Sequence, residues 1–122
     1  MNLRASASDT VTVRVRPVMV SKMIGKLHLA GGYAVYSCCT AYFYVKLKPA
    51  HAGKHWKATV QYYGGGKWHS LASNTYRFEK DGDSAIFLNA PTGYRYRVRA
   101  RFDGDADHLS VTGAWSYFRF MR

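Results

Sequence analysis

Short segments in which apolar and polar residues alternate recur along most of this chain, and they constrain its fold more than any other feature. In residues 94–102, for example, Tyr96, Val98 and Ala100 alternate with arginines. A β-strand places successive side chains on opposite faces, so this pattern predicts a strand with one buried and one solvated face. No segment shows a convincing 3.6-residue period of an amphipathic helix. We therefore expect an all-β protein.

Turn-forming residues separate these segments, and their spacing indicates the architecture. Gly, Pro, Asn and Asp interrupt the alternation, most clearly at the three glycines of residues 64–66. The clearest predicted strands are residues 33–48, 56–63, 68–72, 75–79, 84–88, 94–102 and 114–121; residues 10–16 also alternate, and residues 18–29 form a looser apolar stretch. About seven or eight short strands of this kind are typical of an antiparallel sandwich or barrel.

The apolar phase of the predicted strands also identifies candidates for the core. Residues that share this phase should lie on the inward faces of two packed sheets. They are Phe43, Val45, Trp56, Val60, Tyr96 and Val98. We expect an aspartate in place of Val98 to destabilise the fold strongly, because its charge would be buried without a partner.

From Pro49 onward the chain carries motifs that are similar to those of a known type of module. The motifs are Pro49-Ala50-His51-Ala52-Gly53-Lys54, Gly65-Gly66-Lys67-Trp68, Gly93-Tyr94-Arg95-Tyr96-Arg97-Val98-Arg99-Ala100, Gly104-Asp105-Ala106-Asp107-His108 and Trp115-Ser116-Tyr117-Phe118. They resemble the immunoglobulin-like modules of secreted and surface proteins of actinobacteria and their phages. The resemblance covers about residues 49–120. It implies an immunoglobulin-like or fibronectin type III-like antiparallel β-sandwich, with Leu88, Pro91 and Tyr94 at a tyrosine corner.

The length of the chain and the position of the resemblance predict its domain organisation. A chain of 122 residues fits one domain. We expect residues 18–122 to form the sandwich, and residues 1–17 to form an N-terminal extended arm or a first strand. As an arm, residues 11–16 could add a strand to the sheet of a neighbouring subunit, which would produce a homo-oligomer.

Basic residues exceed acidic residues by a wide margin. The chain holds 18 Lys and Arg against 7 Asp and Glu, a formal net charge of +11. The most concentrated basic feature is a row at alternate positions, formed by Arg95, Arg97, Arg99 and Arg101. Two interpretations stay open: a solvated outer face whose arginines lie over aromatic rings on adjacent strands, or a docking surface for an acidic protein, polysaccharide or nucleic acid. Arg14 and Arg16 are further docking candidates.

Few residues are arranged for metal binding or catalysis. Asp103, Asp105 and Asp107 alternate as in a calcium loop, but these oxygen ligands are too few, and a solvated turn is the competing interpretation. The five histidines form neither an HxH nor an HExxH motif, and the sequence contains no P-loop and no GxSxG nucleophile motif. We therefore predict no cofactor, no resident metal and no enzymatic activity.

The two cysteines, Cys38 and Cys39, are adjacent in the sequence. Neighbouring residues of a strand point to opposite faces, so we expect these two not to pair with each other. They would then form one buried and one outward thiol. A redox or metal-binding role is the alternative.

These observations favour a non-catalytic binding or structural module. We predict a phage protein of the virion surface, a capsid decoration or tail-associated subunit, because the module starts at Met1 without an apolar signal segment and resembles modules of phages. Its partners would be virion shell or tail subunits. The alternatives are an extracellular or cell-surface module that binds cell-wall polymer or carbohydrate, and a basic nucleic-acid-binding protein. No apolar run reaches the roughly 18 residues of a membrane span.

Overall fold

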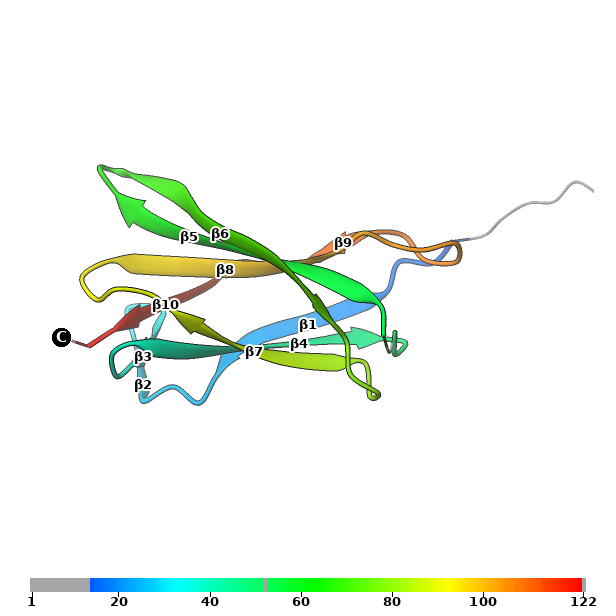
Figure 1. Ribbon diagram of the computed structural model, residues 1–122, viewed down its shortest axis with the longest axis horizontal. Coiled ribbons are helices and arrows are strands. Elements are labelled where there is room, and N and C mark those ends of the chain that lie inside the picture. The colour runs from blue at the N-terminus through cyan, green and yellow to red at the C-terminus, as the bar shows by residue number, and fades with distance from the viewer. Residues whose placement is uncertain (1–13, 52, 122) are drawn as a thin grey trace, which may run out of the picture.

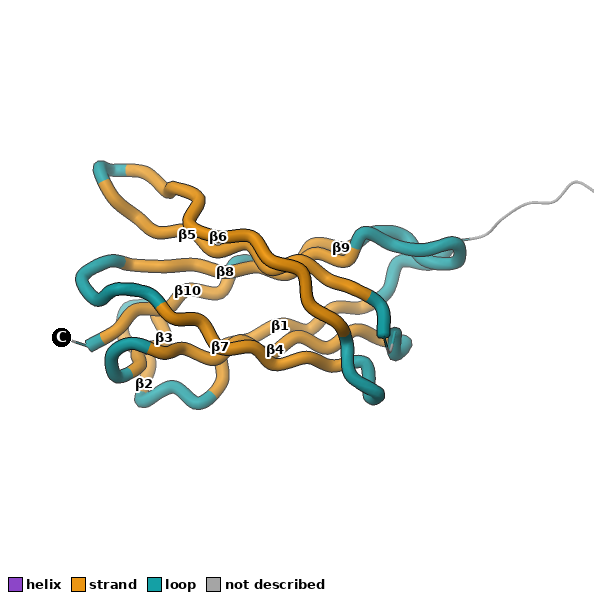
Figure 2. The backbone as a smooth tube through the Cα atoms, viewed as in Figure 1, coloured by secondary structure: helices purple, strands orange, loops and turns teal. Residues whose placement is uncertain are grey.

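The computed structural model describes residues 14–51 and 53–121, which form two β-sheets packed face to face (Figure 1). This arrangement confirms the all-β sandwich that the sequence predicts. Strands fill the middle of the sandwich, and the turns gather at its two ends (Figure 2). The described residues contain no helix, and therefore none that is long and apolar enough to cross a membrane.

The smaller sheet contains three antiparallel strands in the order β1-β4-β7. They are β1 (Val18–Ile24), β4 (Thr40–Lys48) and β7 (Asp83–Asn89). The central strand β4 alternates strictly, with Phe43, Val45 and Leu47 completely buried. This alternation fixes the register, because a shift by one residue would expose the whole apolar set.

The larger sheet contains seven strands, with the path β2-β3-β10-β8-β5-β6 and with β9 paired to β8. Its strands are β2 (His28–Ala30), β3 (Tyr33–Tyr36), β5 (His55–Gly64), β6 (Lys67–Arg77), β8 (Arg95–Phe102), β9 (Val111–Thr112) and β10 (Ser116–Phe120). β3 and β10 run parallel, and the other pairs are antiparallel. The described residues thus form ten strands, more than the seven or eight predicted, and the larger sheet is mixed.

Local features explain where the strands differ from the predicted segments. Residues 33–48 divide into β3 and β4 because a turn at residues 37–39 interrupts them. The predicted segment 68–72 and the first part of the segment 75–79 instead join in β6, which ends at Arg77. There Ala72 pairs with Val60 and Ser70 pairs with Gln61, so Leu71 is an extra residue that forms a β-bulge. A bulge changes the phase of a strand, which makes one long strand resemble two short ones in the sequence.

The six residues predicted to form the core are all buried between the sheets, which confirms that prediction: Phe43, Val45, Trp56, Val60, Tyr96 and Val98. Trp56 joins the two sheets, since its ring centroid lies 6.2 Å from that of Phe43 and 6.1 Å from that of Phe78. Further along the core, Tyr96 stacks on Phe118 at 5.2 Å. Large aromatic side chains therefore supply much of the apolar burial that stabilises the sandwich.

Tyr96, rather than Tyr94, fastens the turn that precedes β8. Tyr96 is buried, and its hydroxyl donates a hydrogen bond to the carbonyl oxygen of Pro91. Tyr94 is 47 % exposed and lies in the turn before β8 begins at Arg95. In a tyrosine corner, the tyrosine hydroxyl bonds to the backbone a few residues upstream. Here that bond is made two positions after Tyr94, by the first side chain of β8 that points into the core.

Residues 14–17 lie along the loop between β8 and β9. Val15 forms a parallel bridge to His108, in which its amide donates to the carbonyl of Asp107 at 3.1 Å and its carbonyl accepts from the amide of Leu109 at 2.9 Å. Most of the predicted arm, residues 1–13, lies outside the described residues, as does the first half of the alternating segment 11–16. The choice between an arm and a first strand stays a prediction.

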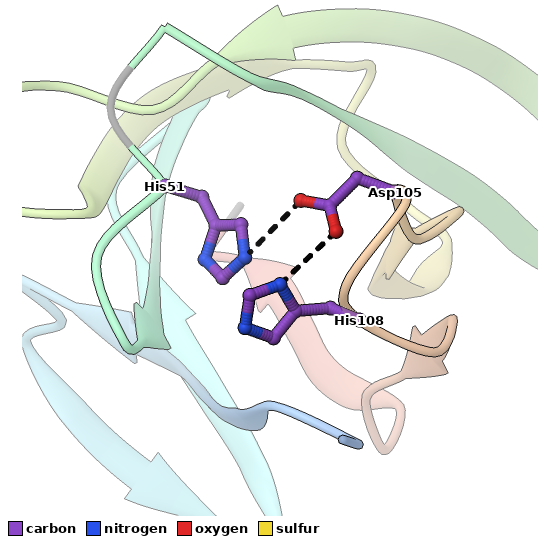
Figure 3. Close-up of side chains that lie close together, drawn as sticks. All are labelled: His51, Asp105 and His108. Carbon is purple, nitrogen blue, oxygen red and sulfur yellow. Dashed lines mark hydrogen bonds and ion pairs between the residues drawn. The ribbon is translucent and has the colours of Figure 1, made fainter. Parts of the chain in front are cut away.

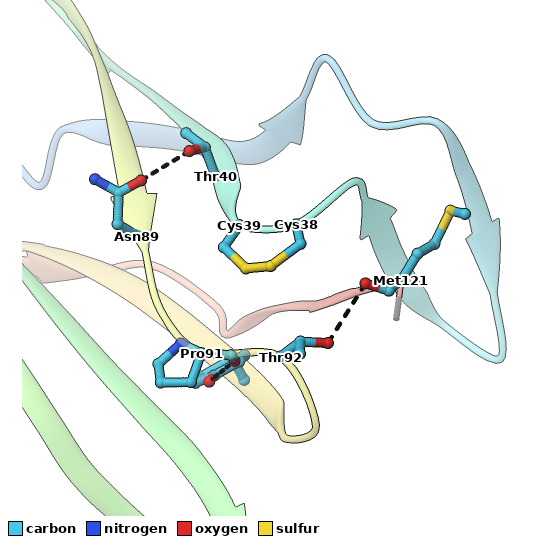
Figure 4. Close-up of a disulfide and its surroundings, with 8 residues drawn as sticks. Cys38, Cys39, Thr40, Asn89, Pro91, Thr92 and Met121 are labelled. Carbon is cyan, nitrogen blue, oxygen red and sulfur yellow. Dashed lines mark hydrogen bonds between the residues drawn. A yellow bond between two sulfur atoms is a disulfide. The ribbon is translucent and has the colours of Figure 1, made fainter.

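The prediction for Cys38 and Cys39 is wrong in both of its parts. The structure joins the two residues by a disulfide, and the peptide bond between them is cis (Figure 4). They lie in the turn between β3 and β4, so the alternation of strand side chains does not apply to them. For the same reason neither cysteine is buried.

Candidate docking surface

The four arginines predicted to share one face of a strand do so on β8. Burial alternates along this strand, with Tyr96, Val98, Ala100 and Phe102 buried and the intervening arginines exposed or half-buried. The arginine row therefore lies on the outer face of the larger sheet, directed away from the core.

Two tryptophans enclose the middle of this row. The guanidinium of Arg97 lies over the ring of Trp68, 4.4 Å from its centroid, and over the ring of Trp115, at 4.1 Å. Arg99 lies over the same Trp115 ring at 4.3 Å. Each such cation–π contact contributes roughly 0.5–2 kcal/mol, depending on how far the pair is removed from water. These contacts offset part of the repulsion between neighbouring positive charges.

Strand register brings the aromatic rings to the row from distant parts of the sequence. Tyr63 on β5 pairs with Arg95 on one side and with Trp68 of β6 on the other. Tyr117 on β10 pairs with Arg97 from the opposite side of β8. The guanidinium of Arg95 consequently lies over the Tyr63 ring, 4.4 Å from its centroid.

The rings form one continuous surface around the arginines. Ring centroids are 5.2 Å apart for Tyr63 and Trp68, 5.8 Å for Trp68 and Tyr117, and 5.6 Å for Tyr117 and Tyr33. We call this surface the arginine–aromatic face and define it by Tyr33, Tyr63, Trp68, Arg95, Arg97, Arg99, Trp115 and Tyr117.

The arginine–aromatic face carries positive charge that the described part of the chain does not neutralise. Within that part, the only ion pair of an Arg or Lys joins Arg101 to Asp103, with 2.8 Å between Nε and Oδ1. Arg97 instead donates from Nε to the neutral Gln61 side chain at 2.8 Å. Three arginines that are fixed against rings, without a carboxylate partner, form a surface of positive potential.

The remaining predicted docking arginines are Arg101, at the end of the same row, and Arg14 and Arg16, which precede β1. Arg101 is tied to the loop after β8 through Asp103, and it also donates to the Thr112 hydroxyl of β9 at 2.7 Å. Arg16 donates to the carbonyl of Ser110 at 3.2 Å, on the segment that leads into β9. Arg14 is exposed in the segment before Val15. Arg14 and Arg16 therefore come from another segment, whereas Arg101 lies on the same face of β8 with its guanidinium held by Asp103 and Thr112.

The sequence indicated the arginines of this face but not their particular aromatic partners. A solvated outer face whose arginines lie over rings on adjacent strands was one of the two open interpretations. The contact of Arg95 with Tyr63 on the adjacent strand β5 agrees with it, whereas Trp68 lies on β6 and Trp115 lies just before β10. Tyr63 and Trp68 flank a glycine turn, so a hairpin register would have paired them. Trp115 lies just before β10, and no local pattern in the sequence predicts its contact with Arg97 on β8.

The three alternating aspartates do not converge on one point. Asp103 pairs with Arg101, whereas the Asp105 carboxylate accepts hydrogen bonds from the Asp107 amide at 2.9 Å and from His108 Nδ1 at 3.0 Å. Desolvation by itself raises the pKa of the Asp105 carboxyl, but these hydrogen bonds outweigh it and hold that pKa below its usual value. Of the aspartates proposed as metal ligands, only Asp105 lies beside other candidate ligands, His51 and His108.

No model of a known protein family matches the chain. No curated protein matches it either.

Proposed function

We propose that this protein is a non-catalytic binding module that docks onto an acidic surface of a partner protein through its arginine–aromatic face. The observation that carries the proposal is the enclosure of Arg97 and Arg99 by Trp68 and Trp115 without a carboxylate. Packing against rings fixes the guanidinium groups in advance, so less side-chain entropy is lost when a carboxylate binds them. Arg, Trp and Tyr are also the residues that contribute most energy at protein interfaces.

The position of the rings favours a protein partner over single-stranded nucleic acid. Nucleic-acid platforms offer free aromatic faces on which bases stack. Here the guanidinium groups of Arg97 and Arg99 already cover the ring of Trp115, and Arg97 also covers Trp68. What the face offers is guanidinium N–H groups, which bind the two oxygens of a carboxylate in a planar, bidentate arrangement.

The proposal assigns no catalytic step to this face. Its residues are arginines and aromatic side chains, and they include no nucleophile positioned beside a general base. For the biological setting we keep the expectation from the sequence, a virion protein whose partner is a shell or tail subunit. Detection of the protein in purified virions tests that setting separately from the docking chemistry.

A double variant, Arg97→Gln with Arg99→Gln, tests the docking chemistry. Its control is Lys22→Gln with Lys48→Gln, which removes two exposed charges from the outer face of the smaller sheet. Poly-L-glutamate serves as the acidic probe at low and moderate salt. We expect the arginine variant to bind about tenfold more weakly at low salt and with a shallower salt dependence, and the lysine control to bind nearly as the parent does.

Equal binding by the parent and the arginine variant at both salt concentrations would show that the row is only a solvated face. A single-stranded oligonucleotide bound more tightly than poly-L-glutamate would instead assign the face to nucleic acid. Thermal unfolding of each variant confirms that the comparison uses folded protein.

A further inference from the structure

A cluster of three metal-ligating side chains lies at one end of the sandwich, away from the middle of the arginine row. His51 comes from the loop between β4 and β5, whereas Asp105 and His108 come from the loop between β8 and β9. Both imidazole rings point toward the Asp105 carboxylate, one to each oxygen (Figure 3). One ligand atom from each of the three residues lies within 4.8 Å of the others.

The hydrogen bonding of His51 leaves one of its nitrogens without a partner. His51 is only 6 % exposed, and its Nδ1 lies within hydrogen-bond distance of the Pro49 carbonyl oxygen. A carbonyl can only accept, so Nδ1 carries the proton and Nε2 of the neutral ring carries a lone pair. This Nε2 is buried without a hydrogen bond and faces Oδ2 of Asp105 at 3.5 Å. In the neutral ring, two electron pairs therefore face each other, which is unfavourable unless a proton or a metal cation lies between them.

The other two residues complete a set of donors around this position. Asp105 offers Oδ2 toward His51 and accepts from His108 Nδ1 through Oδ1 at 3.0 Å. The two imidazole rings lie edge to face, with centroids 4.4 Å apart. The ring of Phe102, 4.9 Å from that of His51, closes the apolar side of the cluster.

We propose that His51, Asp105 and His108 bind a divalent transition-metal ion of the zinc type. Ligands of a tetrahedral zinc ion at about 2.0–2.2 Å are about 3.4 Å from one another, close to the separation of His51 Nε2 and Asp105 Oδ2. Two imidazoles and one carboxylate suit zinc better than calcium, which prefers six to eight oxygens. Donation from His51 Nδ1 to a carbonyl is the outer contact that orients a metal-bound histidine.

The proton balance of binding is simple. The lowered pKa of Asp105 favours its carboxylate form, and the Nε2 lone pair of a neutral His51 ring is available to the ion. A neutral His108 binds through Nε2 in the tautomer whose Nδ1 donates to Asp105, or through Nδ1 once that proton has moved to Nε2, and it releases no proton in either case. A protonated His108 releases one proton on binding. Water supplies the fourth ligand.

Such an ion would join two loops and the segment that leads into β1. The 103–110 loop that carries Asp105 and His108 also holds Val15 through two backbone hydrogen bonds. The ion would tie this loop to residues 49–51, which follow β4 of the opposite sheet. We therefore assign the site a structural role, independent of the arginine–aromatic face.

Thermal unfolding of the untagged protein, with and without Zn²⁺, tests the proposal. Zn²⁺ at about one hundred times its Kd should raise Tm by about 10 °C, EDTA should reverse the shift, and Ca²⁺ should cause none. Asp105→Asn and His108→Gln should abolish the shift, whereas the control His28→Gln, exposed on β2, should keep it. Co²⁺ in place of zinc should give the visible absorption of a tetrahedral site in the parent and not in the two cluster variants.

Two results would overturn the proposal. One is a parent protein whose Tm and absorption spectrum do not respond to either ion. The other is a Zn²⁺ shift of equal size in Asp105→Asn, His108→Gln and His28→Gln, which would place the ion elsewhere. Neither result would affect the docking proposal, since no residue of the arginine–aromatic face takes part.

Discussion

Truncation of Val98 at the centre of β8 tests the packing of the sandwich. Val98 is completely buried and pairs with Val60 on β5 and with Ser116 on β10. Val98→Ala removes two methyl groups from this position. At roughly 0.8 kcal/mol for each buried carbon the lost transfer free energy is about 1.6 kcal/mol, and the cavity that remains brings the total to about 2–3 kcal/mol.

The loss can be measured as a shift in thermal unfolding. Unfolding of a chain of this length has an entropy that converts about 1 kcal/mol into about 4 °C, so Val98→Ala should lower Tm by about 8–12 °C. Val98→Asp should lower the free energy of unfolding by several kcal/mol more, because it buries a carboxyl group. That loss approaches the whole free energy of unfolding of a typical domain, roughly 5–15 kcal/mol.

An exposed valine provides the control for this prediction. Val20 on β1 is 43 % exposed on the outer face of the smaller sheet, so Val20→Ala should change stability by less than about 0.5 kcal/mol. Equal Tm values for Val98→Ala and Val20→Ala, or an unchanged Tm for Val98→Asp, would mean that the register of β8 is wrong.

Two further predictions concern a turn and a carboxylate. Gly82→Ala should destabilise the fold more than Gly66→Ala: both glycines have φ near +80°, but only at Gly82 would the new Cβ lie 2.7 Å from the Ala50 Cα. Equal losses of Tm in the two variants would contradict this steric argument. In EDTA, Asp105 should stabilise the fold above the pKa it has in the unfolded chain, and this stabilisation should be lost as pH falls through its lowered folded pKa. The Tm advantage of the parent over Asp105→Asn should therefore shrink below about pH 4, and a constant difference from pH 6 to pH 2.5 would refute it.

The sequence predicted those parts of the fold that depend on strand alternation alone. Val98 and Val45 follow the apolar phase of regular strands, and both are buried as expected. The alternation fails where the backbone departs from a regular strand. Leu71 adds a bulge to β6, and Cys38 and Cys39 lie in a turn, so neither feature follows a period of two.

The candidate sites were harder to predict because their residues meet across the sheet or between loops. The spacing of Arg97 and Arg99 placed them on one face, but the contact of Arg97 with Trp68 depends on how β8, β5 and β6 pair. The contact of His51 with Asp105 brings together the loop between β4 and β5 and the loop between β8 and β9, which are far apart in the sequence. No local motif predicts that contact. Such contacts follow from the topology and not from spacing along the chain.

The central claim is that the arginine–aromatic face binds acidic protein surfaces, and the indole N–H signals of the three tryptophans test it most directly. In ¹H–¹⁵N spectra of the protein titrated with poly-L-glutamate at low salt, Trp68 and Trp115 on the face should shift. Trp56, which is 1 % exposed in the core, should stay unchanged as an internal control. Added salt should reverse the shifts. Signals of Trp68 and Trp115 that stay fixed while residues elsewhere on the surface respond would contradict the account.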